Sequence, residues 1–312
     1  MMRCRSPRAT GRFVQHCLRL YSVTTPDKVR AAFSHCLSQL QTHDYENYIW
    51  AVQLPKALRP AIVALRAFYI ETELVAEHAK SQSLVSMRCQ WWQSAVNDLY
   101  KGHAPDHPVM TALAEVLQQA QLTRYRLQRI VASREEVSGL GQQPESLAEL
   151  LAQLDSSLGQ LSQLQLEAAH DASPTSAEAA QKVARGVGLA RVLRGTPRDA
   201  SRGRTRLPEE STGRHGVSLS GLAQGRPSPE LCAVAAELAG VAKGNLAEAR
   251  KMTADVPQAS RPLLLPALHA SLWLDRLAAV GHDVFNPALQ ISPVSPLGYQ
   301  LRLKWAMLRH RF

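Results

Sequence analysis

The sequence is rich in residues that favour helices and poor in one that favours strands. Only five isoleucines occur in 312 residues, while alanine, leucine and glutamine are abundant. Alanine, leucine and glutamine stabilise helices, whereas β-branched residues are enriched in strands. Hydrophobic residues make up 45% of the chain and charged residues 20%, which excludes a wholly disordered protein. We therefore expect a folded chain built from helices.

Apolar residues recur at helical spacing through most of the chain. The first such stripe runs from Val29 to Leu40, and Thr25-Pro26-Asp27 before it supplies the signals of a helix start. The predicted helices cover residues 27–40, 45–54, 60–80, 89–99, 108–122, 124–138, 144–170, 176–193, 229–253 and 260–280. Residues 195–228, with many Gly, Pro, Ser and Arg, are predicted to interrupt this pattern, either as a linker or as a loop lining a cavity.

No internal repeat is visible, so the sequence predicts one helical domain over residues 27–290 and a basic C-terminal tail over residues 291–312. The most apolar stretch without charge, residues 262–274, is too short to span a bilayer. Any membrane contact is therefore expected to be peripheral. The tail has two interpretations: a basic amphipathic helix with Trp305 that lies on an anionic membrane, or a solvated final helix.

The formal net charge of +10 is concentrated in two segments. Residues 1–26 contain five arginines and no acid, and residues 182–206 contain eight basic residues against Asp199 alone. The rest of the chain is close to neutral, which is not the pattern of a uniformly basic nucleic-acid binder. The arginine-rich segment also lacks the interleaved aromatic residues that would stack on RNA bases.

The N-terminal segment is typical of a mitochondrial transit peptide, which we place at residues 1–21. It is rich in arginine, contains serine and threonine and has no acidic residue before Asp27. It also lacks the unbroken apolar run of a secretory signal. A disordered basic tail is the alternative. The cysteines that would remain, Cys36, Cys89 and Cys232, form no C-x-x-C pair, so neither a disulfide framework nor a zinc site is predicted.

Two segments could carry chemistry together. Glu73 and Glu77 stand four residues apart on a predicted helix, so their carboxylates share one face. Arg194, Asp199, Arg202 and further arginines follow the end of another predicted helix. Acids facing arginines inside a helical bundle suit magnesium and a diphosphate, because the acids hold the metal and the metal bridges the phosphates.

Several motifs resemble the squalene/phytoene synthase family over roughly residues 40–285. They are Leu54-Pro55 before Ala64-Leu-Arg-Ala-Phe68, the Trp91-Trp92 segment, Leu193-Arg194, and Arg202-Gly-Arg-Thr-Arg-Leu-Pro208. The run His43-Asp-Tyr-Glu-Asn-Tyr48 is similar to the mitochondrial branch of the family, which assists assembly of respiratory complex I. The resemblance implies an all-α fold, a single helical bundle of the trans-prenyltransferase type.

The chain departs from this family at the residues that bind metal. Active members carry two D-x-x-x-D motifs, where this chain has Glu73 and Glu77 at the first and only Asp199 at the second, because Gly195 replaces the leading acid. The longer glutamate shifts a carboxylate by roughly 1 Å, which magnesium tolerates poorly, and Pro197 is expected to disturb the helix. No catalytic residue is predicted. The resemblance implies a vestigial metal and diphosphate site made of Glu73, Glu77, Asp199, Arg194, Arg202 and Arg204.

The resemblance therefore implies a non-catalytic protein on the matrix side of the inner mitochondrial membrane, without cofactor or nucleic acid. Its partners would be complex I subunits or assembly intermediates, with a peripheral membrane contact. The alternative is an active prenyltransferase that uses magnesium and prenyl diphosphates. Two further possibilities stay open for the site residues: the glutamates simply pair with arginines across the bundle, or the site retains an anion or lipid-like ligand.

Overall fold

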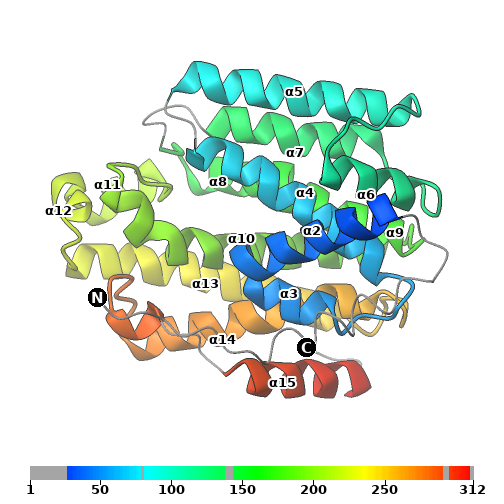
Figure 1. Ribbon diagram of the computed structural model, residues 1–312. Helices are drawn as coiled ribbons and strands as arrows, with labels where there is room; N and C mark the ends of the chain where they lie inside the picture. Colours follow the sequence, from blue (N-terminus) through cyan, green and yellow to red (C-terminus); the bar gives the residue numbers. More distant parts are fainter. Residues whose placement is uncertain (1–26, 79–80, 138–142, 291–294, 310–312) are drawn as a thin grey trace, which may run out of the picture.

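The computed structural model describes residues 27–78, 81–137, 143–290 and 295–309, and over these residues it contains helices and no strand (Figure 1). The predicted all-α class is confirmed. The α-helices are α2 (Asp27–His43), α3 (Tyr45–Ala51), α4 (Arg59–His78), α5 (Gln82–Tyr100), α6 (Pro108–Leu117), α7 (Arg124–Val137), α8 (Leu147–Leu154), α9 (Gln160–Ala168), α10 (Pro174–Ser201), α11 (Glu209–His215), α12 (Leu219–Ala223), α13 (Pro229–Met252), α14 (Pro266–Ala279) and α15 (Pro296–Arg309). A π-helical segment, Asp155–Gly159, joins α8 to α9, and short 3-10 segments cover Arg261–Leu264 and Pro287–Gln290.

Helix α10 runs through the middle of the molecule, with α5 and α7 on one side and α13 and α14 on the other (Figure 1). It packs against α9, α13 and α14. Its start follows from the sequence, because the Ser173 side chain accepts a hydrogen bond from the Ser176 amide and Pro174 occupies the first turn. Residues on α10 can therefore reach both halves of the bundle.

Two glycines let the neighbours of α10 approach closely. A Cβ atom added at Gly186 would lie 2.6 Å from the Leu246 side chain of α13, and one at Gly188 would lie 2.7 Å from Leu154 at the end of α8. Neither distance is compatible with a larger residue unless the packing shifts. Helix packing therefore accounts for the Gly186-Val-Gly188 sequence.

The sequence-based end of α10 at residue 193 was wrong, and so was the continuous interruption over residues 195–228. Helix α10 continues through Gly195 and Pro197 to Ser201, and the segment then contains α11 and α12. An interior proline costs a helix about 3 kcal/mol. Burial offsets that cost, since Thr196 and Asp199 are buried, and Asp199 Oδ2 accepts a hydrogen bond from Arg206 Nε in the loop that follows α10.

Helix α5 begins seven residues before its predicted start, at Gln82, where the Ser81 side chain accepts a hydrogen bond from the Leu84 amide. The predicted transit peptide, residues 1–21, lies outside the described residues. Within the described ranges, no helix combines the length and the apolar character needed to cross a membrane.

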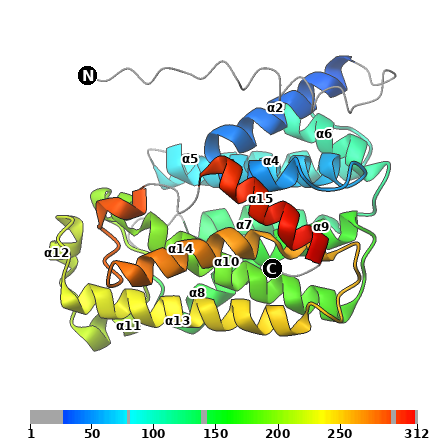
Figure 2. The ribbon, with the colours of Figure 1, turned by 90° about the horizontal axis from the view of Figure 1, so that it is seen from below.

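Helix α15 covers the outside of the bundle. It packs on α3, and its buried side chains are Tyr299, Leu303 and Ala306. Figure 2 shows α15 in the foreground when the molecule is seen from below, in front of α14 and α10. The C-terminal segment is thus a helix seated on the bundle by one face.

Candidate functional site

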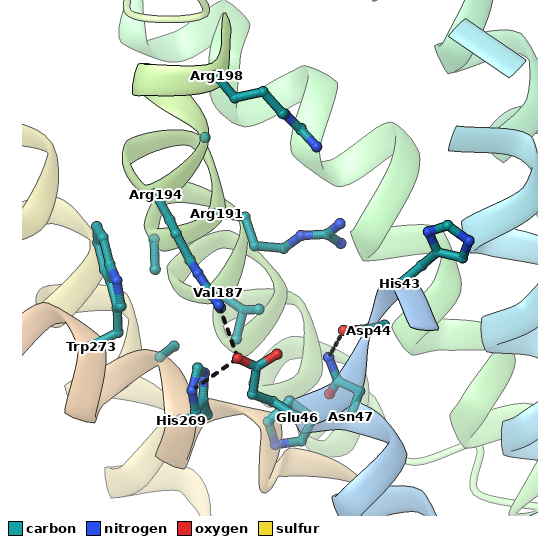
Figure 3. Close-up of a pocket in the computed structure, with 14 residues that line it drawn as sticks. His43, Asp44, Glu46, Asn47, Val187, Arg191, Arg194, Arg198, His269 and Trp273 are labelled. Atoms are coloured by element: carbon teal, nitrogen blue, oxygen red, sulfur yellow. Dashed lines mark hydrogen bonds and ion pairs between the residues drawn. The ribbon is translucent and has the colours of Figure 1, made fainter. Parts of the chain in front are cut away.

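A cavity of about 310 Å³ lies where α3, α10 and α14 meet the end of α2 (Figure 3). The polar and aromatic residues that line it are His43, Asp44, Glu46, Asn47, Arg191, Arg194, Arg198, His269 and Trp273. The remaining lining residues are Val187, Ala190, Gly195, Pro266 and Ala270. The wall supplied by α10 is therefore basic, and the facing wall from the α2–α3 junction carries the acids.

Three guanidinium groups come from one face of α10. Arg191, Arg194 and Arg198 stand at intervals of three and four residues, so they project from successive turns toward the cavity. Against them stand two acids, Asp44 and Glu46. The lining therefore has an excess of positive charge, which suits an anion better than a cation.

Glu46 connects the basic wall to α14. Its Oε1 accepts a hydrogen bond from Arg194 Nη2 over 3.0 Å and lies 3.5 Å from His269 Nε2. Burial lowers the pKa of His269 although Glu46 opposes this, so the imidazole is neutral at neutral pH. Trp273 Nε1 is buried and has no hydrogen-bond partner among the described residues, so this donor is available to a water molecule or a ligand oxygen.

A second ion pair lies beneath the cavity, between the α2–α3 junction and α4. Arg66 Nη2 donates to Asp44 Oδ2 over 2.5 Å and Arg66 Nε donates to the same oxygen over 3.1 Å. Burial would raise the pKa of Asp44, but the guanidinium groups of Arg66 and Arg191 lower it. Only 4% of the Arg66 side chain is exposed, so the acid keeps a deeply buried cation neutralised.

Glu73, the first of the predicted site acids, pairs with an arginine across the bundle. Its Oε2 accepts a hydrogen bond from Arg191 Nη2 of α10 over 2.7 Å. Burial would raise the pKa of Glu73, but Arg191, Arg134 and Arg206 lower it to about 2. The carboxylate in turn raises the pKa of Arg191. Both partners are therefore charged throughout the physiological range.

Asp199, the predicted site acid on α10, is held by the chain that follows this helix. Its Oδ2 accepts a hydrogen bond from Arg206 Nε over 2.8 Å, and the Asp199 side chain is only 8% exposed. A Cβ atom added at Gly195 would lie 2.7 Å from Arg206 Nη2. The Arg206 guanidinium therefore fills the space beside position 195, where the family pattern has its leading acid.

The structure brings together only part of the predicted site. Arg194 lines the cavity, whereas Arg202 and Arg204 do not. Arg202 follows the last residue of α10 as an exposed cap, and Arg204 is partly buried. Glu77 belongs to α4, but its side chain lies outside the described part of the structure. Glu73 and Asp199 share a network with arginines that the predicted set did not contain.

Sequence reasoning missed Arg191 and Arg206 as partners of the two acids, and it missed the acids that line the cavity. The spacing of Arg191 to Arg194 and Arg198 was a usable signal, because it places all three on one helical face. No comparable signal marked Arg206, because it follows the end of α10 and returns to Asp199 through the intervening loop. Asp44 and Glu46 belong to the sequence His43–Tyr48, which carried part of the family resemblance, but no role was assigned to them from the sequence.

A family model described as squalene/phytoene synthase matches residues 40–295. The mouse protein named NADH dehydrogenase (ubiquinone) complex I, assembly factor 6 is 29% identical over 82% of this chain and 77% of its own length. A Drosophila melanogaster homolog of that assembly factor is 28% identical over 93% of this chain and 87% of its own. The crystal structure of a dehydrosqualene synthase superimposes with a TM-score of 0.78 at 18% identity, covering 91% of this chain and 99% of that one.

Proposed function

This chain belongs to the squalene/phytoene synthase family, and from that premise we propose that it assists the assembly of respiratory complex I without catalysing prenyl transfer. Its relatives in mouse and Drosophila melanogaster are named for complex I assembly. The role is that of a folded scaffold that binds subunits or assembly intermediates of the complex. The chain keeps the helical bundle of its family but departs from the metal-binding motifs of the active members at Glu73, Glu77 and Gly195.

The observation that carries this proposal is the pairing with arginines of Glu73 and Asp199, the two motif acids whose side chains the structure describes. Glu73 is bonded to Arg191 and Asp199 to Arg206. A guanidinium group satisfies a carboxylate as a metal ion would, but it brings no open coordination position for a diphosphate oxygen. The same residues that would supply metal ligands in an enzyme here hold α4, α10 and the following loop together.

We infer that these residues do not fit magnesium. The ion demands near-ideal octahedral geometry from oxygen ligands and usually takes one or two carboxylates together with phosphate oxygens. Gly195 offers no ligand, and Arg206 lies 2.7 Å from the position of its missing Cβ atom. A positive guanidinium at that place repels a divalent cation. No catalytic step is therefore assigned to the site.

The proposed location is the matrix side of the inner mitochondrial membrane. The acid-free, arginine-rich residues 1–26 support import into mitochondria, and the names of the relatives support a role beside the respiratory chain. The contact with the membrane would be peripheral, made by basic residues attracted to anionic lipids.

Genetic rescue tests the proposal. In cells from which the gene has been deleted, we expect the amount and activity of assembled complex I to fall while other respiratory complexes are preserved. The informative variant is Glu73→Leu/Arg191→Met, which removes the acid together with the cation bonded to it. It is expected to restore complex I as the wild type does.

Two results would contradict this function. One is intact complex I in the deleted cells together with loss of a prenyl-derived lipid such as a quinone or sterol, which would favour the prenyltransferase alternative. The other is a stably folded Glu73→Leu/Arg191→Met protein that fails to rescue, which would give the acid a role beyond neutralising Arg191.

A further inference from the structure

The C-terminal helix α15 has two apolar faces, and the described residues of the protein cover one of them. Tyr299, Leu303 and Ala306 are buried against the bundle. At about 100° per residue, these three side chains fall within an arc of about 60°. The Tyr299 ring stacks edge-on against His269 of α14, with 5.5 Å between ring centroids. One face therefore fixes the helix firmly on α3 and α14.

The opposite face carries four large apolar side chains that are open to solvent. Leu297 is 66% exposed, Leu301 59%, Trp305 58% and Leu308 75%. By the same helical geometry they fall within an arc of about 80°, centred almost directly opposite the buried side chains. Contiguous exposed apolar side chains of this size mark an interaction surface.

Basic residues border this exposed stripe on both sides. Arg302 and Arg309 stand along one edge and Lys304 along the other, and the helix from Pro296 to Arg309 contains no acidic residue. The Arg309 guanidinium lies 4.2 Å from the centroid of the Trp305 ring, which joins the charge to the aromatic side chain. The whole outer surface of α15 is therefore apolar in the centre and positive at its edges.

From this arrangement we propose that α15 is the membrane-docking element of the protein and lies in the plane of an anionic lipid surface. An apolar stripe sinks to the boundary of the acyl chains while flanking lysine and arginine bind the lipid phosphates. A tryptophan at that boundary keeps its apolar ring in lipid and its N–H near water. The identity of the membrane rests on the proposed function, whereas the docking surface itself does not.

The molecule has a second exposed apolar stripe, on α5. Comparing the charges on the two helices shows why we expect lipid to bind α15. On α5, Leu84, Met87 and Trp91 are 36%, 57% and 44% exposed at helical spacing. That helix carries one arginine, Arg88, and one acid, Asp98, so its charges cancel. Among the helices that the structure describes, α15 alone combines an exposed apolar stripe with a net charge of +3, which complements an anionic surface.

Docking through α15 would also orient the protein. Figure 1 places α15 at the edge of the molecule opposite α5, beyond α3 and α14. With α15 on the bilayer, the α3 and α14 side faces the lipid and the α5 stripe faces away from it. The α5 side is then accessible to a protein partner while the chain is bound to the membrane.

The test uses the full chain and two kinds of lipid vesicle, one of phosphatidylcholine alone and one with about a third of anionic phosphatidylglycerol or cardiolipin. We expect binding to the anionic vesicles, weakened by salt. The arginines of residues 1–26 also attract anionic lipid, so the decisive readout is local: quenching of Trp305 by bromine-labelled acyl chains, taken as the difference between the wild type and Trp305→Phe.

The two matched variants each add two negative charges, but at different places on the protein. Leu301→Glu/Leu308→Glu on α15 is expected to reduce binding at least tenfold and to abolish the quenching of Trp305. Met87→Glu/Tyr125→Glu, on exposed positions of α5 and α7, is expected to bind like the wild type. Unquenched Trp305 in vesicle-bound protein, or an α15 variant that binds and is quenched like the wild type, would overturn the proposal.

The outcome is separable from that of complex I rescue. If the α15 variant keeps full vesicle binding but fails to restore complex I, the helix binds a protein and the lipid proposal is wrong, while the proposed function stands. If the vesicle results agree with expectation but deletion of the gene leaves complex I intact, the proposed function fails and the docking surface remains.

Discussion

The arginines of α10 and the basic residues of α15 differ in what satisfies their charge. On α10, Arg191 and Arg194 are paired with Glu73 and Glu46 of the same chain. On α15, the basic residues border an exposed apolar stripe on a helix without acids. A charge that the packed helices partly enclose must be neutralised by the fold because burial makes an unpaired charge expensive, whereas charges on an outer helix face remain available to a partner. Arg191 and Arg194 therefore link parts of the same chain, although 36% and 46% of their side chains are exposed, and the basic residues of α15 are placed to bind a partner.

The largest expected effect on stability is at the buried ion pair between Asp44 and Arg66 of α4. Asp44→Ala would leave Arg66 buried without its carboxylate, and we expect the free energy of unfolding to fall by about 3–5 kcal/mol. Denaturant unfolding measures it. The control is Asp44→Leu/Arg66→Leu, which removes both charges and should recover most of the loss. Equal destabilisation by the single and double variants would show that the pair matters through packing alone.

Acid should lower the free energy of unfolding by protonating Glu73 and so breaking its ion pair with Arg191. The pKa of Glu73 is lowered to about 2, below its ordinary value of about 4.3. A lowered folded-state pKa gives stability that is complete above the unfolded value and is lost as pH falls from about 4.3 toward 2. The contribution is on the order of 3 kcal/mol. Stability measured from pH 6 to pH 2 should fall less steeply in Glu73→Gln; an unchanged slope would contradict the assigned pairing.

At neutral pH the Glu73→Gln variant isolates the charge from the shape of the side chain. The amide still accepts a hydrogen bond from Arg191 but does not neutralise it, so we expect a loss of about 2 kcal/mol in the free energy of unfolding. Glu73→Leu/Arg191→Met should lose less. A double-mutant cycle over the two positions measures the coupling directly, and a coupling near zero would mean that the pair contributes nothing.

The smallest expected effect on stability is at α15. Leu301 and Leu308 are more than half exposed, so Leu301→Glu/Leu308→Glu should change the free energy of unfolding by no more than about 0.5 kcal/mol, although it is expected to impair lipid binding. Thermal unfolding without vesicles provides the measurement. A large destabilisation would mean that the exposed stripe supports the fold, and the contrast between interior and surface would be lost.

The all-α class followed from composition and apolar spacing, because local helix propensity and the tertiary packing agree over most of the chain. The end of α10 did not follow. Gly195 and Pro197 are local signals of a helix end, and they were overridden by the burial of Thr196 and Asp199 in the bundle and by the bond that Arg206, in the loop after α10, makes with Asp199. Local sequence contains no information on which loop residue returns to a helix.

At the candidate site, too, some features could be predicted from the sequence and others depend on the tertiary structure. The spacing of Glu73 and Glu77 was enough to place them on one face of a helix, and Gly195 itself showed where the chain departs from the family pattern. The choice of Arg191 as the partner of Glu73 depends on how α4 and α10 cross, and the nearness of Arg206 to Gly195 depends on the path of the loop. Arg202 and Arg204 were predicted with the site because the family resemblance implied them, and in the structure they do not line the cavity.

The most direct test of whether arginines have replaced metal chemistry is diphosphate release by the purified protein. The wild type is incubated with farnesyl diphosphate and excess magnesium, and inorganic diphosphate is measured over time beside a protein-free control. We expect release no faster than in the control. Sustained turnover that requires magnesium and is abolished by Glu73→Gln would contradict the account and restore the chain to the enzymes of its family.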